Sequence, residues 1–210
     1  MLVELHQGFC QTTRYQCDYE GLWKRSLSVE AFLQRIGISD AKHAPFGANA
    51  RLMRPEDSLL HQFVHNCVHM FNVPLQSIID AKLIIERWRP DWRQVIERAH
   101  LWRVSGGAYL TLKLARSLLA APVPDHVLKA LNPSVKRRIW FSFFVSNKPI
   151  TAPNDPQGRL TFFRYTGKKR AQQAIIGLPL IDGLVPSVRF AAWYLQQRVL
   201  DHWAYLRGTE

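Results

Sequence analysis

Signals that begin and end helices recur between residues 54 and 131, and they constrain the fold of this chain more than any other feature. The sequence RPED at 54–57 places a proline and two acids directly before an apolar run. Proline loses nothing in the first turn of a helix, where its missing N–H has no partner, and carboxylates there oppose the helix dipole. We therefore predict a helix over about 55–71.

Further helices follow in the same stretch. The segment 75–88 has helical periodicity and is closed by Pro90, and Asp91-Trp92 begins another helical segment. Gly106-Gly107 then interrupts or separates the pattern before a helix at 109–121. Consecutive helices with short connections predict a helical array.

The flanking segments add helices and a little β-structure. Residues 18–37 fit one or two short helices, and 187–207 has the spacing of a long amphipathic helix. Leu2–His6 alternates apolar and polar side chains like a half-buried strand, which could pair with 50–53. Prolines and glycines crowd 146–170, which predicts a surface excursion. The predicted fold is mainly α, with one or two N-terminal strands.

The chain carries a formal charge of +12, from 28 lysines and arginines against 16 acids. This balance favours polyanionic partners such as nucleic acid or nucleotide phosphates, although basic residues along helices are also typical of solvated faces. The three cysteines form no CxxC pair, which fits a reducing compartment, so we expect a cytoplasmic protein. The apolar runs are too short to predict a transmembrane segment.

Three histidines, His61, His65 and His69, fall four residues apart and share one face of the helix predicted at 55–71. Histidines at i and i+4 are a common zinc pair, but Gln62 stands where an HExxH protease has its glutamate. Three ligands from one straight helix also close poorly around an ion. The alternative is a face between helices or domains. The candidates for a pocket or interface are His6, His61, His65, His69 and Asp80.

The segment LLHQFVHNCVH at 59–69 is similar to an LLHLCLHAAKH-type segment of the uncharacterised nucleotidyltransferase family, with its histidines in the same order and spacing. Other motifs resemble that family over about 50–131, and the resemblance extends to 1–30. These motifs are RPED at 54–57, Ile79-Asp80, Asp91-Trp92 followed by Glu97-Arg98-Ala99, and LARSLLAAPVPDHVL at 114–128.

This resemblance implies that residues 1–53 are the remnant of a nucleotidyltransferase-like α+β core and that 54–210 form a helical C-terminal domain. Leu2–His6 would be similar to the strand that carries the third acid of the site, which makes Glu4 a catalytic and metal-binding candidate. In such enzymes carboxylate oxygens hold Mg²⁺, which bridges the phosphates of a nucleoside triphosphate (NTP). Glu4 also fits an exposed carboxylate at a strand edge.

The first two acids of such enzymes form a D-x-D motif, which does not occur in these 210 residues. No Walker A loop or nucleophile elbow offers another catalytic centre. We therefore expect a truncated or inactive form of a protein that transfers a nucleotidyl group from an NTP to an unknown acceptor. A second protein chain could supply the catalytic half. Whether this chain is itself an enzyme stays open.

A cluster of cations follows two phenylalanines near residue 165, and such mixtures are typical of surfaces that bind single-stranded nucleic acid. A solvated loop has the same composition. The alternative function is therefore a non-catalytic basic helical module that binds nucleic acid or a protein partner. The cations of the cluster are Arg164, Lys168, Lys169 and Arg170.

Overall fold

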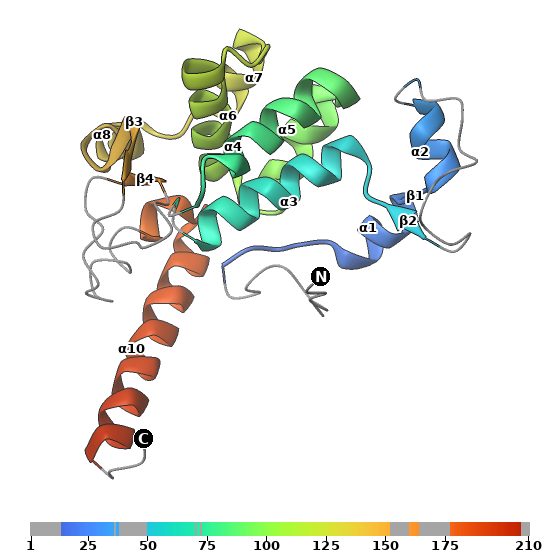
Figure 1. Cartoon of the computed structure of the whole chain (residues 1–210). Helices are drawn as coiled ribbons and strands as arrows, with labels where there is room; N and C mark the ends of the chain where they lie inside the picture. The colour runs from blue at the N-terminus through green and yellow to red at the C-terminus, as the bar shows by residue number, and fades with distance from the viewer. Residues whose placement is uncertain are drawn as a thin grey trace.

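The computed structural model describes residues 14–35, 37, 50–69, 71, 73–151, 160–163 and 177–206, and its fold is mainly α (Figure 1). The central helices are α3 (Pro55–Val68), α4 (Gln76–Leu83) with its π-helical continuation η2 (Ile84–Trp88), α5 (Trp92–Leu101), α6 (Ser105–Leu119) and α7 (Asp125–Ala130). The flanking elements are α1 (Tyr19–Arg25), β1 (Leu27–Ser28), α2 (Val29–Arg35), β2 (Arg51–Leu52), α8 (Val135–Phe144), β3 (Val145–Thr151), β4 (Leu160–Phe163), the 3-10 turn η3 (Leu178–Leu180) and α10 (Leu184–Leu206).

Helix α3 begins at Pro55, as the RPED signal predicts, and lies at the centre of the core. It packs against α4, α5 and α6, and its side chains Leu59, Leu60 and Phe63 are fully buried. Each such side chain stabilises the fold by roughly 1.5–3 kcal/mol relative to exposure. The core of the molecule is therefore built within the stretch that carries the helix signals.

A buried polar network links three of these helices. Asn66 on α3 donates from Nδ2 to Oγ1 of Thr111 on α6, at 3.2 Å. The hydroxyl of Ser77, next to the start of α4, donates to Oδ1 of Asn66, and Gln62 donates to that hydroxyl. Buried polar groups cost free energy unless they are paired, so this network favours one relative placement of α3, α4 and α6.

The predicted separation of two helices near Gly106-Gly107 lies at 102–104, because α5 ends at Leu101 and α6 begins at Ser105, so the pair itself lies in the first turn of α6. A β-carbon at Gly107 would lie 2.0 Å from Sγ of Cys67 on α3. A β-carbon at Gly106 would lie 2.2 Å from the guanidinium of Arg137 on α8. The two glycines let other groups approach α6 closely, and this packing outweighs their poor helix propensity.

A short antiparallel pair of strands, β1 and β2, joins the N-terminal helices to the core. Leu27 of β1 pairs with Leu52 of β2. Residues 51–52 were expected to pair with Leu2–His6, but β1 is the partner that the structure describes. Leu2–His6 lies outside the described residues, so the pairing predicted for it stays untested.

The C-terminal region comprises α8, the antiparallel β3–β4 hairpin and α10. Figure 1 shows α10 extending away from the central helices, with the C-terminus at its far end. Arg14 anchors its first half, because its guanidinium lies 3.8 Å from the ring centroid of the buried Phe190. Among the described residues, no helix combines the length and the apolar character that a membrane crossing needs.

Candidate functional site

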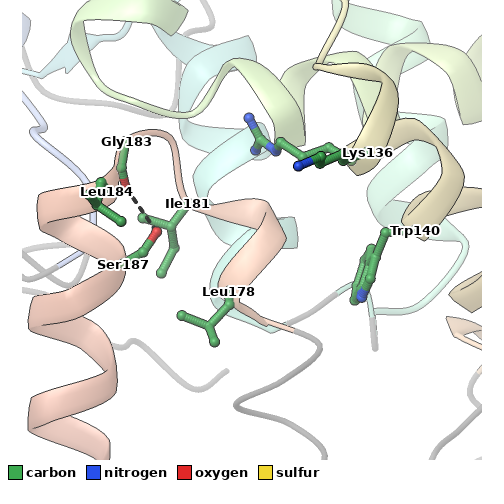
Figure 2. Close-up of a pocket in the computed structure, with 8 residues that line it drawn as sticks. Lys136, Trp140, Leu178, Ile181, Gly183, Leu184 and Ser187 are labelled. Atoms are coloured by element: carbon green, nitrogen blue, oxygen red, sulfur yellow. Dashed lines mark hydrogen bonds between the residues drawn. The ribbon is translucent and has the colours of Figure 1, made fainter.

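A surface pocket of about 540 Å³ opens between α8, η3 and the start of α10 (Figure 2). Helix α8 contributes Lys136 and Trp140, which lie one helical turn apart. The opposite wall is apolar and consists of Leu178, Ile181 and Leu184. This volume falls within the range of about 300–1,000 Å³ that is typical of ligand pockets. The remaining lining residues are Arg137, Gly183 and Ser187.

The lining combines a cation, an indole ring and an aliphatic wall. Figure 2 shows Lys136 and Trp140 on one helix, with Leu178 across the opening. The hydroxyl of Ser187 donates to the carbonyl oxygen of Gly183 at 2.8 Å, so its oxygen can accept a further hydrogen bond. This set of groups suits a ligand with an anionic group and an apolar or aromatic body.

A single carboxylate holds the pocket against the core. Oδ2 of Asp182 accepts hydrogen bonds from the backbone N–H and the hydroxyl of Ser105, at 2.6 and 2.5 Å. Oδ1 of the same carboxylate accepts from Nη1 of Arg137 at 2.5 Å. Asp182 thus satisfies an N–H at the start of α6 and places a negative charge at the positive end of its dipole. The pocket wall is therefore fixed to the N-terminus of α6.

The three histidines share one face of α3, as their spacing predicts. The ring centroids of His61 and His65 lie 6.2 Å apart, and those of His65 and His69 lie 4.5 Å apart. Burial, assisted by the two neighbouring imidazoles, lowers the pKa of His65. Within the described part of the chain, no group of three histidine, cysteine or acidic side chains is placed to hold a metal ion. A face between helices or domains therefore stays a prediction.

Asp57 and Glu56 are fully buried, and arginines pair with both. Asp57 accepts from Nε of Arg25 at 3.1 Å and from Nη1 of Arg98 at 2.9 Å. Oε1 of Glu56 accepts from Arg35 at 3.1 Å and from the backbone N–H of Asp91 at 2.9 Å. Guanidinium groups pair with both oxygens of Asp57 and with Oε1 of Glu56, whereas Oε2 of Glu56 is buried without a hydrogen-bond partner among the described residues. One free oxygen beside three arginines does not fit a Mg²⁺ site, and the paired oxygens hold the N-terminal helices on the core.

Asp80 is the other predicted site residue that the structure describes, and it is not among the residues that line the pocket. Asp80 lies on α4, where Oδ1 accepts a hydrogen bond from Gln76 at 2.7 Å. The candidates that lie outside the described residues are Glu4, His6, Arg164, Lys168, Lys169 and Arg170. Their proposed roles therefore stay predictions from the sequence.

Cys67, in the histidine-containing segment of α3, is buried against α6 and is not suited to nucleophilic chemistry. Burial raises the pKa of its thiol to about 12. The thiolate is the nucleophilic form of cysteine, so this side chain is unreactive near neutral pH. Its place in the motif is explained by packing against Gly107.

The family of this chain follows from a match between its sequence and one family model. The model described as "Uncharacterised nucleotidyltransferase" matches residues 1–120, more than half of the 210 residues. The chain belongs to the uncharacterised nucleotidyltransferase family. Neither the curated proteins nor the solved structures gave a match. The family resemblance of the histidine-containing segment is thus confirmed.

The part of this nucleotidyltransferase-family chain that matches the model ends at α6. The matched residues include α1 to α6, with the histidine face and the buried carboxylates. The pocket residues from Lys136 to Ser187 follow the matched range. Sequence reasoning missed this pocket, because its walls come from two separate segments, 136–140 and 178–187, that no local motif joins. Only the basic and aromatic composition of 136–140 signalled it.

Proposed function

We propose that this chain takes part in nucleotidyl transfer from an NTP to an acceptor, and that the pocket between α8 and α10 binds the acceptor. The family match over residues 1–120 carries this proposal. Nucleotidyl transfer moves a nucleoside monophosphate group to the acceptor and releases pyrophosphate. The acceptor must therefore lie beside the nucleotide, and the attachment of the pocket to the family-matched helices through Ser105 supports this assignment.

The link between Arg137, Asp182 and Ser105 supports this assignment. Ser105 begins the last helix of the matched range, so the pocket and the family-matched part share a structural element. Lys136 would bind an anionic group of the acceptor, and Trp140 would contact its apolar or aromatic body. Arg137 acts through Asp182 and positions the wall.

Glu56 and Asp57 do not form a Mg²⁺ site, because arginines pair with both carboxylates. The family resemblance places Glu4 at a metal site, and Glu4 lies outside the described residues. A single carboxylate does not hold the metal ions of such a reaction, so further acids must complete the site. We propose that a second protein chain supplies them.

Isothermal titration with ATP and GTP, with and without Mg²⁺, tests the nucleotide part of this proposal. We expect binding that requires Mg²⁺ and is lost in Glu4→Gln. Glu20→Gln is the matched control, because the side chain of Glu20 is 79% exposed and pairs only with Lys24 at the surface. No binding of either nucleotide to the chain would overturn a nucleotide site on this polypeptide and would favour the non-catalytic binding module.

The alternative is a non-catalytic basic module that binds nucleic acid or a protein partner. The charge of +12 and the lack of a D-x-D motif in the sequence favour it. Titration of a labelled single-stranded oligonucleotide tests it, and binding should weaken as salt rises. The double substitution Lys168→Glu and Lys169→Glu should reduce the affinity, whereas Lys113→Glu on exposed α6 surface should change it much less.

A further inference from the structure

Helix α10 presents large apolar side chains to solvent. Val185, Val188, Leu195 and Val199 are 57%, 58%, 64% and 58% exposed. Most large apolar side chains of the central helices are buried instead, and their exposed exceptions, Leu83 on α4 and Leu101 on α5, lie on different helices. A contiguous exposed apolar surface on a protein often marks an interaction site.

These side chains follow the spacing of a coiled-coil seam. Val185, Val188, Ala192, Leu195 and Val199 are separated by steps of three, four, three and four residues, and Ala192 is exposed as well. Such a 3-4-3-4 pattern places every member on one narrow stripe, which packs against a second helix. We call these five residues the outer face of α10.

The opposite side of α10 is already in contact with the chain. Phe190 is buried beneath the guanidinium of Arg14, and Oη of Tyr194 is shielded from solvent. The helix is thus held to the body by one side. Its outer face is directed away from those contacts, in the part of α10 that extends from the central helices (Figure 1).

The charges beside the seam select the partner. Residues 184–200 contain Arg189 and Arg198 and no acid, and both arginines occupy positions that flank the seam. We propose that the outer face of α10 docks an amphipathic helix of a partner protein, with an apolar seam and acidic flanks. Opposite charges at these flanking positions choose partners in paired helices.

Two other occupants fit the face less well. A second copy of this chain would bring another basic helix and another charge of +12 to the contact, so the charges would repel. Helices that lie on membranes have a strongly charged polar face, whereas the side of α10 opposite the seam packs against the chain through Phe190 and Tyr194. An acidic amphipathic helix fits both the apolar seam and the arginines beside it.

The test uses a designed peptide of about three heptads, with leucine at the seam positions and glutamate at the flanks. Its binding to the full chain is measured by fluorescence anisotropy. We expect saturable binding that weakens as salt rises. A matched peptide with lysine in place of each glutamate should bind much more weakly. Equal binding of the two peptides, or no binding of the acidic one, overturns the proposal.

Leu195→Glu tests whether the outer face is the contact. This substitution should weaken binding of the acidic peptide by roughly tenfold or more, because it removes a leucine that the peptide would cover and adds a charge that repels the peptide. Leu101→Glu is the matched control, because Leu101 is 62% exposed on α5, and it should leave the affinity unchanged. Equal loss in both variants overturns the proposal.

Two further measurements separate the rejected occupants. In analytical ultracentrifugation the chain should sediment as a monomer, and a dimer that Leu195→Glu dissociates would identify a second copy as the occupant. Any binding of the chain to vesicles that contain phosphatidylserine should be unchanged by Leu195→Glu. Vesicle binding that Leu195→Glu abolishes would assign the face to a membrane and overturn the protein partner.

Discussion

Helices α6 and α10 are both long and rich in apolar residues, but the apolar side chains of α6 are buried and many of those of α10 are exposed. On α6, Leu110, Leu112 and Leu114 are at most 3% exposed, whereas Leu195 on α10 is 64% exposed. Helix α6 is enclosed by α3, α4, α5 and α7. Helix α10 contacts the body through one side. The same kind of sequence therefore gives a core helix or an outlying one, according to the neighbours that the chain supplies.

This difference follows the extent of the family match. The family model covers α1 to α6, and α3 to α6 supply most of the buried core, which Leu131, Phe141 and Leu180 complete from the following residues. The pocket and α10 follow the matched range in the chain and use the N-terminus of α6 as their support. The core therefore draws mainly on the family-matched helices, and α10 is attached at its edge.

The largest effect should come from the ion pairs that tie the N-terminal helices to the core. Asp57→Ala leaves the guanidinium groups of Arg25 and Arg98 without their carboxylate, at sites with 27% and 14% side-chain exposure. Breaking one partner of a buried pair costs about 3–5 kcal/mol, so the free energy of unfolding in urea should fall by about 3 kcal/mol. Asp125→Ala, whose pair with Arg116 is exposed, should cause no measurable change.

A pair of leucine substitutions compares the two helices directly. Leu112→Ala should lower the free energy of unfolding by about 2–5 kcal/mol, because a fully buried side chain leaves a cavity. Leu195→Ala should change it by no more than about 0.5 kcal/mol. Both values come from urea titrations followed by circular dichroism. Equal losses would mean that α10 belongs to the core.

A smaller effect should come from the crossing of α3 and α6. Gly107→Ala places a β-carbon against Sγ of Cys67, and overpacking of this kind costs about 1–3 kcal/mol. The loss should shrink when Cys67→Ala is present, because the smaller side chain makes room. Thermal unfolding of the two single variants and the double variant measures this coupling. Strict additivity would show that the two residues do not meet.

The smallest effect concerns pH. The pKa of His65 is lowered in the folded chain from an ordinary value of 6.5, so the unfolded state takes up the proton first. Its contribution to stability is complete above about pH 6.5 and is lost as the pH falls from there towards the folded pKa. His65→Gln should therefore reduce the loss of stability between neutral and mildly acid pH. An unchanged pH dependence would contradict the shift.

Local signals in the sequence predicted most of the helices. RPED marks the start of α3, and Asp91 caps α5 by accepting from the N–H groups of Arg93 and Gln94. These features act within a few residues, so a pattern in the sequence can reveal them. The helix at Leu184–Leu206 also follows its predicted periodicity, although it begins before the expected residue. The breakers at 146–170 predicted a surface excursion, whereas Val145–Thr151 and Leu160–Phe163 form an antiparallel hairpin.

Contacts between distant residues escaped prediction. The acids of RPED were interpreted as helix-dipole residues, whereas Asp57 pairs with Arg25, 32 residues earlier, and with Arg98, 41 residues later. Asp182 caps α6 from 77 residues away. Neither partner choice leaves a local pattern in one sequence. The pocket was missed for the same reason, since its two walls come from separate segments.

Hydrogen–deuterium exchange of the full chain tests the central claim most directly, that α3 to α6 form the centre of the core and α10 has a face left for a partner. Exchange rates report local opening free energies. We predict that α3 and α6 exchange slowest, that α10 exchanges much faster, and that the acidic peptide slows exchange in α10 alone. Protection of α10 equal to that of α6 without peptide would contradict the account.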